Sequence, residues 1–220
     1  MKLLQLPIDK FISSGKWRAQ AHIGSSNQRL NNRFETVPLA RVVQESKTAI
    51  EPSTLRDRDF FYVGLENVES ITGDPLSIIR VSSESVRSRS KLFKSGDVLY
   101  GRLRPYLRKV FLAPDPLDGL CSTEFVVLRA LEGVILPTFL REVLASEAVT
   151  EIVSRLQAGS ALPRVSSKDL LKVEIPLPPL DVQSSIAAEA ERLHEKRRAL
   201  LKEAEHCRSA TSDLMTLLYK

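Results

Sequence analysis

The chain has 220 residues, of which 43% are hydrophobic and 27% are charged, the composition of an ordinary soluble globular protein. No window approaches the roughly 18 consecutive apolar residues of a membrane-spanning helix, and polar residues interrupt the first segment too often for a signal peptide. The net charge of +5 favours an anionic partner, such as a nucleic acid or a membrane surface.

The first predicted region is an N-terminal arm over residues 1–35, which is polar and rich in turn residues. Residues 36–180 are predicted to form one α+β (or α/β) domain. Short β-type runs recur there between turn signals, as in a mixed twisted sheet or a partial barrel. The predicted strands cover 60–65, 77–81, 97–103, 109–113, 124–130 and 171–177.

One predicted helix, over residues 137–156, interrupts the strands and begins at a proline. Its spacing places apolar residues on one face, so we expect it to pack against the sheet. These residues are Phe139, Leu140, Val143, Leu144, Ala148, Ile152 and Leu156. The prolines at 176, 178 and 179 then end the domain, because such a cluster cannot lie inside a helix or a central strand.

Residues 181–220 are predicted to form one long helix, which Asp181 can cap and which neither Pro nor Gly interrupts. Apolar residues recur at seven-residue intervals, as in a coiled coil. They are Ile186, Leu193, Leu200, Cys207 and Leu214, with Leu217 three residues later. A helix of about 38 residues would be about 57 Å long, so we expect a partner helix. The alternative is that the stripe packs on its own domain, which is too short to cover it.

The positive charge is concentrated in residues 80–110, which hold nine cations and two acids, whereas residues 181–220 hold seven of each sign. Its centre is GDVLYGRLRPYLRKV at 96–110. On a strand, Arg102 and Arg104 would leave one face while Leu103 enters the core. Two guanidinium groups at that spacing suit neighbouring phosphates. The alternative is a solvated strand face whose cations pair with acids, but acids are scarce in this segment.

Four segments, in this order, resemble the specificity subunit of type I restriction-modification enzymes. They are YVGLENVE (62–69), GDVLYGRLRPYLRKV (96–110), GLCSTEFVVLR (119–129) and GSALPRVSSKDLLKVEIPLPPLDVQSSI (159–186), with the long helix after them. The resemblance covers residues 36–219. In that family each target-recognition domain is followed by a spacer helix, and a full subunit carries two such units. This chain carries one unit and resembles a half-sized form.

The resemblance implies DNA recognition without catalysis, and the sequence agrees. It has no glycine-rich turn for S-adenosylmethionine or a nucleotide, no Asn-Pro-Pro-Tyr segment and no GxxxxGK[ST]. The cysteines, Cys121 and Cys207, do not form a disulfide framework, and the histidines lie near no metal-ligand cluster. We expect Cys121 to be a buried structural thiol. The predicted protein is therefore cytoplasmic and reduced, with no cofactor and no metal.

A motif shared by the family is expected to bind the DNA backbone, and segments without a motif are expected to read bases. The predicted phosphate contacts are Arg102, Arg104, Tyr106 and Lys109, with a second possible site at Arg164 and Lys168. The base-reading candidates are Arg56, Asp57, Arg58, Arg87, Arg89 and Ser160. Arginine can donate twice to guanine, and aspartate can accept from cytosine. The alternatives are exposed charged loops and, at 157–164, a plain turn.

The resemblance also implies an assembly. Two chains would pair antiparallel through their C-terminal helices as a homodimer and bind a two-part target in double-stranded DNA with inverted half-sites. A helix of about 57 Å limits the half-site separation to about 17 base pairs. The helices would dock methyltransferase (M) subunits and, through them, the restriction (R) subunit, and no membrane partner is expected. Within the family, a second and different half-subunit is the alternative partner.

Two other functions stay open at this point. The chain could be a stand-alone dimeric DNA-binding regulator or phage-defence accessory protein, which the absence of a co-purifying methyltransferase would favour. It could also be a pure scaffold that binds no DNA. Salt-dependent binding of duplex DNA would argue against the scaffold, since several phosphate contacts make affinity fall steeply with salt.

Overall fold

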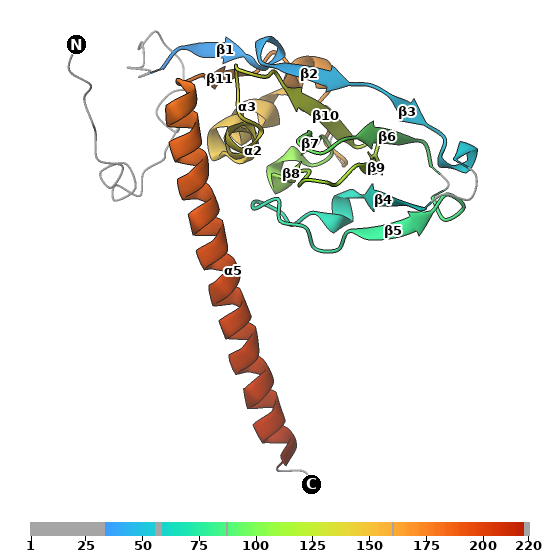
Figure 1. The fold of residues 1–220 in the computed structure, drawn as a ribbon, viewed down its shortest axis with the longest axis vertical. Coiled ribbons are helices and arrows are strands. Elements are labelled where there is room, and N and C mark those ends of the chain that lie inside the picture. The colour runs from blue at the N-terminus through green and yellow to red at the C-terminus, as the bar shows by residue number, and fades with distance from the viewer. Residues whose placement is uncertain (1–33, 56–58, 87, 160, 218–220) are drawn as a thin grey trace, which may run out of the picture.

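Two larger sheets, a two-stranded ribbon and a long C-terminal helix make up the fold (Figure 1). The structure is a computed structural model that describes residues 34–55, 59–86, 88–159 and 161–217. Nearly all of the predicted N-terminal arm thus lies outside the described residues. Helix α5 (Leu180–Leu217) starts beside the ribbon and extends well past the sheets (Figure 1). This arrangement confirms the predicted α+β class with a long terminal helix.

The first sheet has four antiparallel strands in the order β2-β10-β7-β8. Their bounds are Val43–Ser46 (β2), Phe125–Ala130 (β10), Val98–Gly101 (β7) and Val110–Leu112 (β8). Both faces of β7 are covered, which explains its continuous apolar run. Val98 and Tyr100 face the larger core cluster beneath the helices, whereas Leu99 faces a second cluster on the other side.

The second sheet has five strands in the order β3-β6-β9-β4-β5. Their bounds are Ala49–Ile50 (β3), Ser90–Phe93 (β6), Gly119–Ser122 (β9), Asp59–Val63 (β4) and Ile79–Ser82 (β5). Only the β4–β9 pair is parallel among these described strands. Val63, Phe93 and Cys121 of this sheet join Leu99 and Val127 of the first sheet in the second core cluster. That cluster therefore joins the two sheets.

The helices cover the other face of the first sheet. They are α2 (Pro137–Ala145), α3 (Glu147–Leu156) and α4 (Ser167–Leu170). The predicted single helix over 137–156 is wrong at Ser146, which has an extended backbone with ψ of 154°. Its hydroxyl accepts a hydrogen bond from the amide of Val149 (3.3 Å) and so caps a new helix. The predicted packing is confirmed for α2, because Phe139, Leu140 and Leu144 lie in the larger core cluster. It is wrong at the end of α3, where Val149 and Val153 are buried and Leu156 is exposed.

All six predicted strand segments contain a strand, namely β4, β5, β7, β8, β10 and β11 (Glu174–Pro176). Five short strands were missed: β1 (Thr36–Pro38), β2, β3, β6 and β9. Among the described strands β11 pairs with β1 alone, so Pro176 ends an edge ribbon, as the proline cluster predicts. Short 3-10 turns lie at Leu39–Arg41 (η2), Pro52–Thr54 (η3), Leu65–Asn67 (η4) and Pro105–Leu107 (η5).

The first turns of α5 belong to the core of the domain. The buried side chain of Gln183 accepts a hydrogen bond from the amide of Leu136 (2.8 Å) and donates to the carbonyls of Val134 (3.1 Å) and Pro178 (2.9 Å). Ile186 packs against the larger core cluster. Beyond these turns the helix leaves the core. No helix in the described part of the chain combines the length and the apolar character that crossing a membrane requires.

Candidate nucleic-acid interface

Two segments that the sequence singled out lie side by side in the structure. The amide of Arg104 donates to the carbonyl of Pro163 (2.8 Å), and the amide of Val165 donates to the carbonyl of Arg102 (3.1 Å). The loop that precedes Val165 is closed by two backbone hydrogen bonds between Ala158 and Arg164, at 2.8 and 2.9 Å. The basic segment 102–104 and the loop 158–164 therefore form one surface, which we call the basic ridge.

Arg102 and Arg104 do not alternate on a strand, which corrects the predicted strand over 97–103. β7 ends at Gly101, and Arg104 adopts a left-handed backbone with φ of 49° just before Pro105. The proline has no amide to continue a ladder, and it opens the turn η5. The side chain of Arg104 is exposed and makes no hydrogen bond or ion pair with any residue that the structure describes. Arg104 is thus the cation of the ridge most available to an outside anion.

The structure brings an acid to the ridge that the local sequence does not show. Glu124, in the turn between β9 and β10, binds the guanidinium of Arg164 at 2.9 Å and lies 3.9 Å from Nε of Arg102. The hydrogen bond to Glu124 raises the pKa of Arg164. One carboxylate is therefore shared by two arginines, and the ridge keeps a net positive charge. Acids are scarce near Arg102 in the sequence, as expected, but the fold brings Glu124 close to it.

Lys109 and Arg108 bind other segments of the domain. The half-buried ammonium of Lys109 donates to the carbonyl of Leu65 (2.7 Å), so we leave this predicted phosphate contact out of the candidate surface. Arg108 lies 3.7 Å from Glu147 on α3, with its side chain only 17% exposed. Both cations tie neighbouring segments together instead of facing solvent.

Tyr106 and Lys168, two further predicted phosphate contacts, remain accessible. Tyr106, in η5, is 51% exposed. Lys168, in α4, is exposed, and among the described residues it acts electrostatically on the neighbouring Asp169. Because α4 follows Val165 at once, Lys168 extends the ridge past the loop.

Lys91 of β6 is a half-buried cation that sequence reasoning did not assign to the site. Its ammonium donates to the carbonyl of Phe125 (2.7 Å), and burial lowers its pKa. Arg102, Glu124 and Cys121 act on the same ammonium electrostatically. β6 pairs with β9 in the second sheet, whereas β10 belongs to the first sheet, so the group forms where the two sheets meet and no local pattern could have revealed it. Cys121 is fully buried, and burial raises its pKa to about 12, which confirms the predicted structural thiol.

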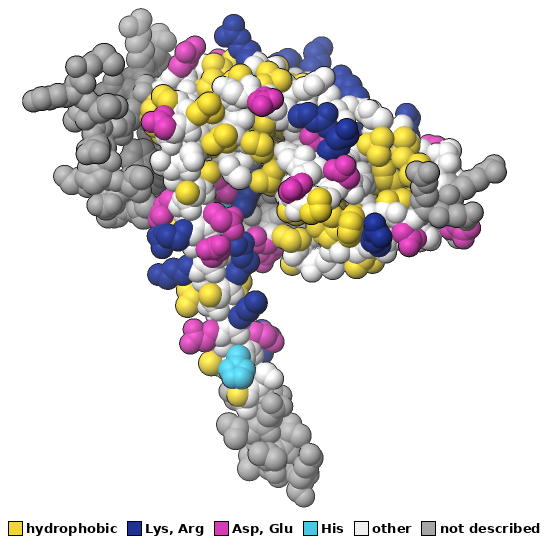
Figure 2. Space-filling view, viewed as in Figure 1, with side chains coloured by type: hydrophobic (Ala, Val, Ile, Leu, Met, Phe, Trp, Pro, Cys, Tyr) yellow, Lys and Arg dark blue, Asp and Glu magenta, His cyan; other side chains and the backbone are white. Residues whose placement is uncertain are grey.

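Most base-reading candidates fall outside the described residues, namely Arg56, Asp57, Arg58, Arg87 and Ser160. Arg89, which precedes β6, is described and exposed. The flanking η3 turn and the β5–β6 connection lie on the side of the domain away from α5 (Figure 1). Figure 2 shows Lys and Arg side chains along the upper part of the domain and charges of both signs along α5. Three or more metal-ligating side chains gather nowhere in the described part of the chain.

The apolar stripe on α5 has two parts. Ile186 packs against the core of its own domain, so the first heptad position belongs to the fold and not to a partner. Leu193 and Leu200 are 45% and 56% exposed, and Cys207 is exposed as well. Leu214 and Leu217 lie within α5, but their side chains fall outside the described part of the structure. The described domain thus leaves the middle of the stripe uncovered.

The α+β domain thus carries a basic ridge and a long, partly uncovered helix. The chain belongs to the family of type I restriction modification DNA specificity domains, whose family model matches residues 56–204. The specificity domain is the DNA-recognition component of a type I restriction-modification enzyme and not its catalytic component.

Two curated relatives are specificity subunits of type I restriction enzymes. The EcoDI subunit of Escherichia coli is 28% identical over 162 residues, which is 73% of this chain and 34% of that protein. The HindI subunit of Haemophilus influenzae is 22% identical over 168 residues, which is 74% of this chain and 32% of that protein. The chain therefore spans about a third of the length of these relatives.

Solved structures show the same fold. The HsdS subunit from Thermoanaerobacter tengcongensis superposes with a TM-score of 0.68 at 31% identity, over 80% of this chain and 45% of that one. A chain from a study of complex assembly and conformational transition of the type I R-M system gives 0.70 at 30% identity, over 86% and 49%. The S subunit from M. genitalium gives 0.51 at 18% identity, over 80% and 43%, and it supports the fold alone.

Proposed function

We propose that this chain recognises double-stranded DNA as a specificity unit of a type I restriction-modification complex, with the basic ridge as its contact to the phosphate backbone. Arg104, Tyr106 and Lys168 are the accessible members of the contact set. Arg102 and Arg164 join it by exchanging part of their interaction with Glu124 for phosphate oxygens. Bases would be read by the segments around Arg89 and by residues 56–58, 87 and 160.

The observation that carries this proposal is the pairing of residues 102–104 with the loop 158–164 by backbone hydrogen bonds. Two separately cationic segments become one ridge, and the exposed side chain of Arg104 makes no hydrogen bond or ion pair in the described structure. A structural arginine would have an acid beside it, as Arg108 has Glu147. The membership of the family supports DNA as the polyanion that the ridge binds.

We also propose that two chains pair through the uncovered stripe of α5. Leu193 and Leu200 are about half exposed on a helix whose charged residues surround them. Such a stripe is expected to be covered, because burying each leucine stabilises an assembly by about 2 kcal/mol. An antiparallel pair would present two recognition domains and therefore bind two inverted half-sites.

The proposed partners beyond DNA are methyltransferase subunits and, through them, the restriction subunit. The resemblance to type I specificity subunits supports this assembly, and a matching structure comes from a study of complex assembly in a type I system. The chain itself would contribute recognition and a docking surface along paired α5 helices.

The test of the proposal is selection of a target from a randomised duplex library with the purified chain. We expect an enriched sequence of two inverted half-sites and an affinity that falls steeply with salt. The chain is then co-expressed with the methyltransferase encoded next to it. Binding with no co-eluting methyltransferase would favour a stand-alone regulator. No duplex binding even at low salt would refute DNA recognition altogether.

A further inference from the structure

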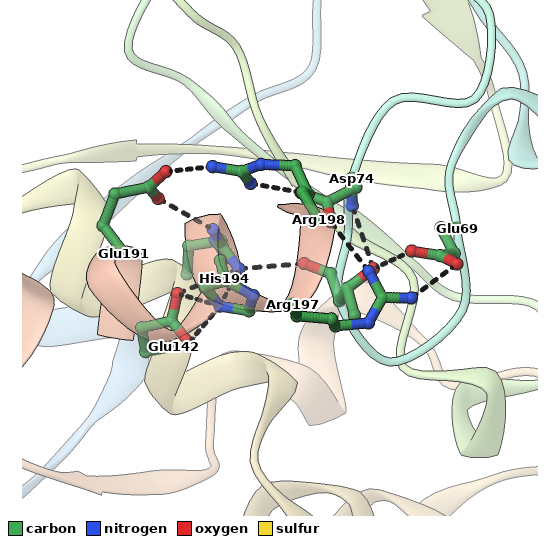
Figure 3. A network of polar contacts seen from close by, with 9 residues as sticks. Glu69, Asp74, Glu142, Glu191, His194, Arg197 and Arg198 are labelled. Atoms are coloured by element: carbon green, nitrogen blue, oxygen red, sulfur yellow. Dashed lines mark hydrogen bonds and ion pairs between the residues drawn. The ribbon is translucent and has the colours of Figure 1, made fainter. Parts of the chain in front are cut away.

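A loop of the recognition domain forms ion pairs with α5 at Arg197 and Arg198, well beyond the turns of the helix that pack in the core. This loop, residues 69–74, is called the clasp loop below. Glu69 binds Arg197 of the helix at 2.8 Å. Asp74 binds Arg197 at 3.2 Å and Arg198 at 3.0 Å, one carboxylate oxygen to each (Figure 3). The four side chains are between 15% and 39% exposed, so the ion pairs are partly shielded from solvent.

The carboxylate of Asp74 fixes the rotation of the helix about its own axis. Adjacent helical residues do not face each other, because each residue turns the helix by about 100°. One carboxylate can reach both Arg197 and Arg198 only if it lies over the angle between them. Rotation of α5 in either direction would therefore break one of the two contacts.

The clasp loop is itself rigid. Its ends are joined by a hydrogen bond from the amide of Glu69 to the carbonyl of Asp74 (2.8 Å), and the buried hydroxyl of Thr72 donates to Glu69 (2.5 Å). Ile71 holds a left-handed backbone with φ of 76°, which is strained for a β-branched residue. A Cβ on Gly73 would lie 1.9 Å from the carbonyl oxygen of Val110, so the loop also fits tightly against β8.

A second set of contacts holds the preceding turn of the helix. Arg141 of α2 donates to the carbonyl of Thr72 (2.8 Å) and lies 3.0 Å from the ring of His194. His194 also lies 3.4 Å from Glu142 (Figure 3). The clasp loop, α2 and α5 therefore form one polar network at the point where the helix leaves the domain.

The position of this network along α5 lets it control the direction of the helix. It lies 14 residues after the buried Gln183, or about 21 Å along the axis, so two anchors define the direction of the helix. The 19 residues beyond Arg198 extend about 28 Å. A tilt of about 10° would displace the helix end by about 5 Å, which exceeds the spacing of about 3.4 Å per base pair.

We propose that the clasp loop, through Glu69 and Asp74, positions α5 and thereby sets the half-site separation that the paired chains accept. This inference rests on the proposed binding of a bipartite target. In this account the length of the helix limits the separation, and the clasp loop selects one separation within that limit. Arg197 and Arg198 act as positioning residues and need not touch DNA.

The test compares two double variants that each remove two arginines from α5. Arg197→Ala/Arg198→Ala breaks the clasp. Arg192→Ala/Arg208→Ala is the matched control, because Arg192 pairs with Glu189 and Arg208 with Glu205 within the helix. Circular dichroism and thermal melting check that each variant keeps its helix content.

The first readout is the distance between spin labels on the exposed positions Ser209→Cys of α5 and Ser53→Cys of the domain, in a Cys207→Ala background and with chains diluted with unlabelled protein. We expect one narrow distance distribution in the parent and the control, and a broad or shifted one in the clasp variant. Asp74→Asn should have a similar effect and add little to the double variant, since both act through the same contact. An unchanged distribution in the clasp variant would overturn the inference.

The second readout is binding to duplexes that carry the selected half-sites at separations increasing one base pair at a time. We expect the parent to prefer one separation by about tenfold, similar to the effect of a mismatched base pair. The clasp variant should bind a single half-site as the parent does, but its preference should fall to about twofold. A preference retained by the variant would overturn this inference alone. A parent that accepts all separations equally would refute bipartite binding as well.

Discussion

Removal of Arg104 should weaken DNA binding and also lower the slope of log K against log salt, which reports the number of phosphate contacts. Each phosphate contact that a cation makes adds about 0.9 to the slope of log K against log salt. Arg104 has no acid beside it in the described structure, so Arg104→Ala should lower the slope by about the whole 0.9. A fourfold rise in salt would then weaken the variant about 3.5-fold less than the parent.

Arg102 should contribute less, because it already interacts with Glu124. The distance of 3.9 Å and a side chain that is 34% exposed indicate a partly neutralised cation. Arg102→Ala/Arg104→Ala should therefore lower the slope by between about 0.9 and 1.8. Glu124→Gln should act in the opposite direction and steepen the slope, since it releases Arg102 and Arg164 from their shared carboxylate.

Fluorescence anisotropy with one labelled duplex over a range of salt concentrations measures all of these slopes. Arg41→Ala is the control, because Arg41 is an exposed arginine in η2 whose side chain has no partner in the described structure. If Arg104→Ala lowers the slope no more than Arg41→Ala does, the ridge is not the phosphate contact. A flatter slope in Glu124→Gln would show that Glu124 does not compete with DNA phosphates for Arg102 and Arg164.

Three further outcomes test the dimer, the core and the clasp loop. Leu200→Asp should raise the dimer Kd by about a thousandfold in sedimentation, since about 2 kcal/mol is lost from each chain, whereas Leu201→Asp, outside the heptad series, should not. Asp97→Ala should lower the free energy of unfolding in urea by about 2 kcal/mol, because it removes the bidentate hydrogen bond that the buried Asp97 accepts from Arg129, whose own side chain is 44% exposed and can be solvated. The hydrogen bond from Arg197 of α5 lowers the pKa of Glu69 below its ordinary value of 4.5. The spin-label distance should therefore stay constant as the pH falls to 4.5 and change only as the pH falls further, through the lowered pKa of Glu69.

The sequence predicts the parts of the fold that have strong local patterns. β10 is mostly apolar and α5 has 38 residues with no Pro or Gly, so these two elements were predicted with nearly correct bounds, whereas β7 ends two residues before the predicted strand does. Strands such as β3, with two residues, carry no recognisable alternation and exist because β6 lies beside them. The break at Ser146 was missed because the apolar spacing continues across it.

The candidate site was predictable only as a set of cations. The sequence shows that residues 102–109 are basic, but not that Lys109 binds the carbonyl of Leu65 or that Glu124 lies between Arg102 and Arg164. These partners come from other strands and loops, which no local spacing reports. The contacts of the clasp loop could not be predicted from local spacing either, because Asp74 and Arg198 are 124 positions apart in the chain.

The placement of acids connects the ridge with the helix. Residues 181–220 are electrically neutral in the sequence, yet Arg197 and Arg198 are bound by acids of the recognition domain. Glu69 and Asp74 therefore have their charge compensated on the α5 side, where they do not offset the cations of the ridge. Because the field at a surface is the sum of all nearby charges, acids that are paired with Arg197 and Arg198 subtract little from the positive field at the ridge.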